Sequence, residues 1–368
     1  MSPSVSKVSL SELERQESAI QFDKPLEHSS WVSTSFQSEE EAIAVGFLAE
    51  QFGRSSSMKQ LKYENAVYKV LAAIGVIVNR EKLLDGPVHV HLMTLLPYGE
   101  YGNSEQLRFL VSQTMSQFRF QGHEVKAFLD FYRSVPESTG LIDLKTSGAF
   151  EYGKSMALMF GHRNMSGVVF DRGQLVRSES YTTDLGFHHL VNAISEQSPV
   201  RSLSSLTKLL YGLDVSSNPI SLTSSSLEGL CSSLESHNRQ TEQRLLRKAI
   251  NEEMGIYWNK LRRHISIHWP SDVESLIIGG GAADFSSVAL RTGIPKVEHY
   301  WAKEHQESLI RELGLDRLVC EASIQSSLAM RLLDVYGAYQ YLQRHLKLWN
   351  SRSRASKTAV AAVKPVSA

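Results

Sequence analysis

Residues 276–282 read Leu-Ile-Ile-Gly-Gly-Gly-Ala and are the most informative stretch of the chain. The apolar residues predict a buried strand, and the glycines predict a turn into a helix over residues 285–290. Because glycine has no β-carbon, such a turn lets a ligand approach the backbone, and the following helix presents unpaired N–H groups to an anion. A tight turn needed only for packing explains the same residues. The dinucleotide pattern G-x-G-x-x-G and the Walker pattern are not matched here, so neither a Rossmann oxidoreductase nor a P-loop NTPase is favoured.

A second turn with polar residues lies upstream, between two apolar stretches. Residues 156–160 and 165–170 predict two strands and residues 174–181 a third, so this region is a meander. The turn between the first two strands consists of Gly161, His162, Arg163 and Asn164. Successive N–H groups in such a turn can cradle phosphate oxygens, and the fork of Arg163 matches phosphate geometry. A solvent-exposed hairpin without a ligand is the alternative.

A carboxylate precedes this meander. Glu137 follows Pro136 directly after a predicted strand, where a carboxylate can orient an attacking water molecule. A glutamate that is merely solvated fits the same position.

The composition describes an ordinary globular chain. It has 368 residues, 39 basic and 39 acidic side chains, and a formal net charge of zero. This length suggests two lobes, and neutrality argues against non-specific nucleic-acid binding, which needs a basic surface. With two cysteines, no signal-like N-terminus and no apolar run long enough to cross a bilayer, we expect a soluble cytoplasmic protein.

Further elements follow from periodicity. Residues 1–30 are polar and expected to be flexible, and the basic segment 351–368 is expected to be a disordered tail. Apolar spacing predicts helices over residues 39–52, 59–77, 104–118, 184–194, 239–265 and 326–349, a strand over 87–96, and short helices and loops in the serine-rich segment 202–233.

Two histidine-containing segments have alternatives to function. His89 and His91 share one face of a predicted strand, as metal ligands can, but an exposed strand face explains them without a third ligand. The cations among residues 260–268 suggest a nucleic-acid patch, yet cations at the end of a helix also complement its dipole.

Taken in this order, these segments resemble the actin-like ATPases of the ParM/StbA plasmid-segregation family, in the superfamily of actin, heat-shock chaperone ATPases and sugar kinases. The resemblance covers roughly residues 30–350, and residues 160–166 and 184–187 are its most distinctive part. It implies an α/β fold, the actin-like (ribonuclease H-like) bilobal ATPase fold, with a nucleotide cleft between two lobes. Residues 1–154 would form the first lobe, residues 155–330 the second, and residues 331–350 a helix that returns to the first lobe.

The resemblance also implies a site and a function. ATP and Mg²⁺ would be the ligands, with Glu137 positioning water and Asp334 on the connecting helix. The phosphates would be approached by Gly161, His162, Arg163 and Asn164, and the adenosine by Gly279, Gly280, Gly281 and Ala282. The protein would form filaments by self-association, hydrolyse ATP on assembly, and contact centromere-like DNA through a DNA-binding adaptor protein.

Two departures from the family pattern keep alternatives open. Nothing in residues 1–40 resembles the family's first phosphate hairpin, so that piece is expected to be lost, to be encoded separately, or to be missing from a non-hydrolysing relative. Losing the N–H bonds of this hairpin would cost roughly 3–9 kcal/mol, or about two to six decades of ATP affinity.

Met159 stands where the family has a magnesium-holding Asp, with Asp171 or Asp143 as substitutes. The alternatives are a catalytically silent actin-fold scaffold or regulator and a sugar-kinase-like phosphotransferase, although the short first lobe leaves little room for a sugar.

Overall fold

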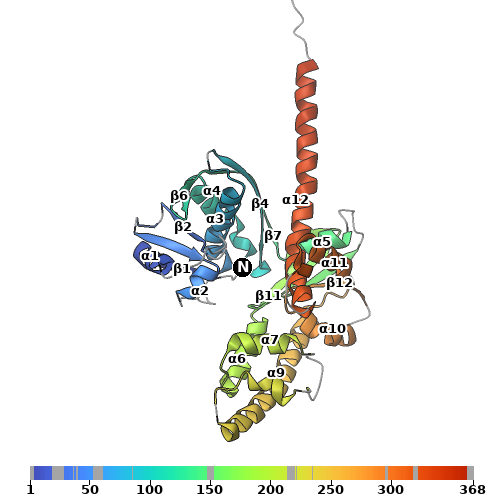
Figure 1. Ribbon diagram of the computed structural model, residues 1–368. Helices are drawn as coiled ribbons and strands as arrows, with labels where there is room; N and C mark the ends of the chain where they lie inside the picture. The colour runs from blue at the N-terminus through green and yellow to red at the C-terminus, as the bar shows by residue number, and fades with distance from the viewer. Residues whose placement is uncertain are drawn as a thin grey trace, which may run out of the picture. The chain divides into compact units, whose positions relative to one another are not determined.

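The computed structural model divides the chain into two compact units, residues 1–135 and 136–368, which are described separately (Figure 1). This division lies upstream of the lobe boundary expected after residue 154, because helix α5 (Thr139–Thr146) packs against elements of the second unit. The structure describes residues 4–18, 29–35, 37–38, 40–52, 61–84, 86–146, 153–213, 220, 222–233, 235–294, 297–317 and 322–362.

The first unit contains an antiparallel sheet in the order β1-β3-β2-β5-β6. Its strands are β1 (Val5–Ser9), β2 (Trp31–Thr34), β3 (Glu41–Val45), β5 (Phe118–Phe120) and β6 (His123–Val125). Strands β4 (Val88–Leu96) and β7 (Ala127–Pro136) form a separate pair. The strand expected over residues 87–96 is therefore confirmed.

Helix α3 (Lys62–Arg80) covers this antiparallel sheet, and α4 (Ser104–Met115) packs beside it. The helix approaches closely because it carries Gly75 where a β-carbon would lie 2.3 Å from the ring of Phe120. The core between helix and sheet is apolar and includes Val32, Val67, Leu71, Val111, Phe118 and Phe120.

Two expectations for the N-terminal part differ from the structure. The described part of residues 1–30 contains β1 and α1 (Leu10–Ser18), and β1 pairs with β3 instead of being flexible. Residues 39–52 were expected to be one helix but form β3 and the short helix α2 (Phe47–Gln51). Gly46 separates them with φ of +71°, which no continuous helix allows.

The second unit is built on a mixed sheet in the order β10-β9-β8-β12-β13, with β11 (Tyr181–Thr183) also paired to β9. The first two strands of the meander are confirmed as β8 (Lys154–Phe160) and β9 (Met165–Asp171), which pair antiparallel. The third strand was predicted over residues 174–181 but is limited to β10 (Gln174–Leu175), also antiparallel to β9, because a 3-10 helix follows at Arg177–Glu179. Strands β12 (Val273–Gly279) and β13 (Glu298–Tyr300) run parallel to β8. The carboxyl ends of β8, β12 and β13 therefore share one edge of the sheet, where ligands commonly bind in α/β folds.

Helices of the second unit form two groups. Helix α12 (Ala322–Ala362) packs with α5 and α11 (Lys303–Glu312), and α6 (Phe187–Gln197) packs with α7 (Leu203–Tyr211) and α9 (Ser236–Ile267) (Figure 1). Two further short α-helices of this unit are α8 (Ser224–Glu228) and α10 (Ser287–Gly293).

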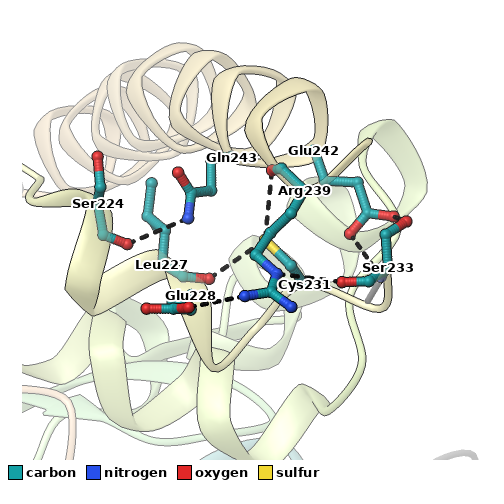
Figure 2. Close-up of polar contacts among 8 residues, drawn as sticks. All are labelled: Ser224, Leu227, Glu228, Cys231, Ser233, Arg239, Glu242 and Gln243. Carbon is teal, nitrogen blue, oxygen red and sulfur yellow. Dashed lines mark hydrogen bonds and ion pairs between the residues drawn. The ribbon is translucent and has the colours of Figure 1, made fainter. Parts of the chain in front are cut away.

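The end of the serine-rich segment is attached to α9 by polar contacts (Figure 2). The carboxylate of Glu242 accepts hydrogen bonds from the backbone N–H and the hydroxyl of Ser233, while Arg239 forms an ion pair with Glu228 at 2.8 Å. Short helices in this segment are as predicted.

The last helix is longer than expected. Residues 351–362, which were expected to be a disordered tail, continue α12, and residues 363–368 lie outside the described chain. Within the described chain, no helix combines the length and apolarity that crossing a membrane requires.

Candidate functional site

The turn after β8 is tightly closed. The N–H of Gly161 donates to the carbonyl of Asn164 at 3.0 Å, and a β-carbon on Gly161 would lie 2.7 Å from that oxygen. A side chain at position 161 would thus force the turn open. Asn164 is buried, whereas the His162 side chain is exposed.

The first turn of α6 packs directly on this hairpin. Phe187 donates its N–H to the carbonyl of Gly161 at 3.1 Å, and His188 donates to the carbonyl of His162 at 2.7 Å. A β-carbon on Gly186 would lie 2.1 Å from the carbonyl carbon of Arg163. Gly186 is the N-cap of α6, so this helix begins at Phe187 and not at residue 184 as predicted. The N-terminal donors of α6 hold the hairpin in place.

Both histidines at this contact favour the neutral form. The rings of His162 and His188 lie 5.5 Å apart. Although part of the His162 side chain contacts solvent, loss of solvation beside neighbouring protein atoms, and then the charges of His188 and Arg331, lower the pKa of His162. Partial burial, and then the charge of His189, lower the pKa of His188. A neutral imidazole at position 162 can donate or accept a hydrogen bond beside the hairpin.

The glycine-rich turn lies against the same hairpin. Ala282 donates its N–H to the carbonyl of Phe160 at 3.1 Å, and Gly280, with φ of +95°, would place a β-carbon 2.5 Å from that oxygen. Gly279 ends β12 directly beside Met159 of β8. The structure therefore brings together residues 161–164 and 279–282, which the sequence indicated as two separate candidate ligand-binding turns.

Asp334 of α12 caps the N-terminus of α5. Its carboxylate accepts hydrogen bonds from the N–H groups of Ser138 at 2.7 Å and Gly140 at 2.8 Å. The pKa of Asp334 is raised to about 7, chiefly by burial, with the charge of Glu137 contributing to the rise and the N–H donors opposing it. The predicted pair Glu137 and Asp334 thus lies close enough to interact electrostatically. The role of Glu137 with water stays a prediction.

Sequence reasoning missed Arg331, which lies one turn before Asp334 on α12. A β-carbon on Gly281 would lie 2.6 Å from its Cγ, and its charge affects His162. Arg331 therefore lies between the glycine-rich turn and the hairpin, where it adds a cation. No local motif marks a single arginine in a helix, so the sequence alone did not identify it.

The two expected substitutes for a magnesium-holding carboxylate are engaged elsewhere. Asp171 pairs in register with Lys154, at the opposite end of β8 from the turn, roughly 20 Å away at about 3.3 Å per residue. Asp143 forms an ion pair with Arg344 of α12. Among the described residues, no three His, Cys, Asp or Glu side chains are clustered as metal ligands.

A cavity of about 430 Å³ opens at the end of β13. Tyr300 pairs with Ile277, so the residues after β13 are level with the end of β12 and its glycines. The guanidinium of Arg291 lies 5.3 Å from the centre of the Trp301 ring. The lining is formed by Arg291, His299, Tyr300, Trp301, Ala302, Lys303 and Glu304. No local pattern marks this cavity, because its residues come from α10, β13, α11 and the turn between β13 and α11.

Comparisons with known proteins identify the fold. No family model and no curated protein sequence matches the chain. Solved structures that match it with high probability are actin homologues, so the chain has an actin-like fold, as predicted.

Three of these structures illustrate the likeness. The actin-like protein Alp7A is 14% identical with a TM-score of 0.59, and the match covers 96% of this chain and 93% of that one. Ta0583, an archaeal actin homologue, is 10% identical with a TM-score of 0.53 and 86% of each chain covered. ParM of Bacillus thuringiensis with AMPPNP is 13% identical with a TM-score of 0.51, covering 89% of this chain and 90% of that chain.

Proposed function

We propose that this chain is an ATP-binding, filament-forming protein that segregates plasmid or other DNA in the cytoplasm. The observation that carries the proposal is the carbonyl of Phe160, which accepts a hydrogen bond from Ala282 and so joins the hairpin to the glycine-rich turn. With the two loops fixed side by side, the hairpin suits the anionic part of a ligand and the glycine-rich turn suits its planar part. ParM of Bacillus thuringiensis, of similar fold, has been solved with AMPPNP.

Each part of the proposed site has a chemical role. Gly161, whose N–H is bonded within the turn, would leave room for the phosphates to approach the backbone, and His162 and Asn164 would offer donors. Arg163 and Arg331 would supply positive charge. Gly279, Gly280 and Gly281 would allow the adenosine to lie against the backbone. Glu137 would orient the water that attacks the γ-phosphate.

The cavity beside β13 supports binding of the base. Tyr300 offers an aromatic ring and Arg291 a planar cation, both of which can stack on a purine, while Trp301, which is only 7% exposed, contacts the Arg291 guanidinium. The residues of the cavity and of the two loops thus suit a nucleotide better than a metal ion held by the protein alone. Magnesium would arrive bound to the nucleotide, since Met159 offers only a thioether at the hairpin.

A second candidate is an actin-fold scaffold or regulator that does not hydrolyse ATP. Met159 favours it, because a thioether cannot hold magnesium-bound water as a carboxylate does. This protein would keep the fold and its self-association, and it would release no phosphate.

The first experiment is calorimetric titration of the full chain with Mg-ATP, followed by ATP-dependent pelleting and a phosphate-release assay. Micromolar binding with nucleotide-dependent pelleting supports the filament proposal, and pelleting without phosphate release supports the scaffold. Absence of ATP binding would contradict an autonomous ATPase. Association with DNA would be tested only through an adaptor, which the family resemblance alone implies.

A further inference from the structure

The C-terminal turns of α9 contain a pair of histidines that the proposed function does not use. His264 and His268 lie one helical turn apart, with ring centres 4.4 Å from each other. The ring of Tyr181 in β11 lies 5.0 Å from His264 and 4.4 Å from His268. Gly167 fixes this tyrosine, because a β-carbon there would lie 2.4 Å from the Tyr181 ring. Three aromatic rings from two elements are thus held together.

Two polar atoms of this cluster are buried without a hydrogen-bond partner in the described chain. They are Nε2 of His264 and the hydroxyl of Tyr181, whose residue is only 8% exposed. Buried polar groups are nearly always bonded to protein, water or an ion. The unmatched imidazole nitrogen of His264 suits a ligand that accepts an electron pair, and the unmatched hydroxyl of Tyr181 suits a hydrogen-bond acceptor bound beside it.

The second histidine is oriented for such a ligand. Nδ1 of His268 lies 2.9 Å from the carbonyl oxygen of His264. A carbonyl only accepts, so Nδ1 carries the proton and Nε2 keeps its lone pair. A backbone carbonyl on the far ring nitrogen is the usual partner of a metal-bound histidine, since it fixes both the tautomer and the ring. His268 is exposed, so an ion has access from solvent.

We propose that His264 and His268 bind a divalent transition-metal ion of the zinc class, with Tyr181 as a positioning residue. Imidazole nitrogens spaced by one helical turn are suitable ligands for such ions. Water molecules complete the coordination.

The role of Tyr181 follows from its burial. The hydroxyl of Tyr181 is buried beside both imidazole rings without a hydrogen-bond partner in the described chain, and a phenol can donate a hydrogen bond to metal-bound water. His189 is not a third ligand, because its Nε2 lies 3.3 Å from Nζ of Lys260. With two protein ligands, the site is expected to be weaker than a four-ligand structural zinc site.

The test is calorimetric titration of the full chain with ZnCl₂, purified without a histidine tag and without nucleotide. We expect one ion per chain, an affinity loss of about tenfold or more in both His264→Gln and His268→Gln, and a smaller loss in Tyr181→Phe. The matched control is the double variant His89→Gln/His91→Gln. That pair lies on β4, and His89 already bonds Asp130 at 3.0 Å, so zinc binding should not change.

Thermal unfolding provides an independent measurement. Zinc should raise the Tm of the natural chain and leave that of His268→Gln unchanged, since only the folded protein presents both imidazoles. His268 is exposed, so its variant is expected to fold. The proposal is overturned if zinc does not bind, if His268→Gln binds it equally well, or if the His89/His91 variant abolishes binding. None of these outcomes depends on ATP binding.

Discussion

Gly337 of α12 and Gly140 of α5 meet backbone to backbone. A β-carbon on Gly337 would lie 2.0 Å from the carbonyl oxygen of Gly140, and one on Gly140 would lie 1.8 Å from the carbonyl oxygen of Asp334. At the same crossing, the Asp334 side chain accepts the N–H of Gly140 at 2.8 Å. The two helices thus cross with no room for a side chain, which fixes Asp334 over the start of α5.

The first prediction concerns this crossing. Gly337→Ala should destabilise the second unit, because the methyl group cannot be placed without moving one helix away from the other. Strain of this kind typically costs about 1–3 kcal/mol, against roughly 0.5–1 kcal/mol that alanine gains over glycine in a helix. Urea unfolding followed by circular dichroism measures the net change.

Gly255→Ala in the middle of α9 is the matched control. A β-carbon there meets nothing within 4 Å, so the variant should gain stability through helix propensity alone. If Gly337→Ala gains stability as Gly255→Ala does, the helices do not cross as closely as described.

The second prediction is a pH dependence that originates at Asp334. Its pKa is raised from 3.8 to about 7 in the folded protein, chiefly by burial. Between these values the folded state holds a proton that the unfolded chain has released. The contribution of Asp334 to the free energy of unfolding is therefore full below pH 4 and is lost as the pH rises through 7.

Asp334→Asn removes this dependence, because the amide carries no charge at any pH. Between pH 5 and pH 8, the natural chain should lose stability relative to this variant when urea midpoints are compared. Asp171→Asn, which removes an exposed carboxylate from β9, serves as the control. Parallel pH profiles for the natural chain and Asp334→Asn would contradict the prediction.

The local parts of the candidate site were predictable because each is a turn with its own pattern. Residues 161–164 lie between two apolar strands, and residues 279–282 follow a third, so each loop is visible without the rest of the chain. Their contact through the carbonyl of Phe160 was not predictable. It depends on the parallel pairing of β8 with β12, which local patterns do not specify.

Where prediction failed, tertiary pairing overrode local spacing. Ile43, Val45 and Phe47 are compatible with a helical stripe, yet the first two lie in β3 because β1 and β2 pair with it on either side. Strand β1 was missed since its polar residues resemble a flexible segment. Arg331 was missed since a single cation in a helix becomes informative only when Gly281 is placed beside it.

The third prediction tests the cation between the loops. Arg331→Gln should weaken Mg-ATP binding about ten- to hundredfold, because a hydrogen bond to a charged group contributes about 1.5–3 kcal/mol. Calorimetric titration measures it. Arg262→Gln removes an exposed arginine from α9 and should leave the affinity unchanged. Equal loss in both variants would indicate a general electrostatic effect, and no loss in either would remove Arg331 from the site.

The last prediction concerns Met159, whose Sδ lies 3.2 Å from the position of a β-carbon on Gly279. If the thioether is what limits catalysis, Met159→Asp should place a carboxylate at the end of β8 and make ATP binding depend on magnesium. Oxygen ligands suit Mg²⁺, whereas a thioether does not.

The control is Met159→Asn, because asparagine is similar to aspartate in size and carries no charge. Titration with ATP in the presence and absence of magnesium separates them: the Asp variant should bind about tenfold more tightly with the ion, as expected for one added charge-assisted contact. Equal behaviour of the Asp and Asn variants would show that the position does not control the metal. Circular dichroism of both variants checks that the new polar side chain has not unfolded the second unit.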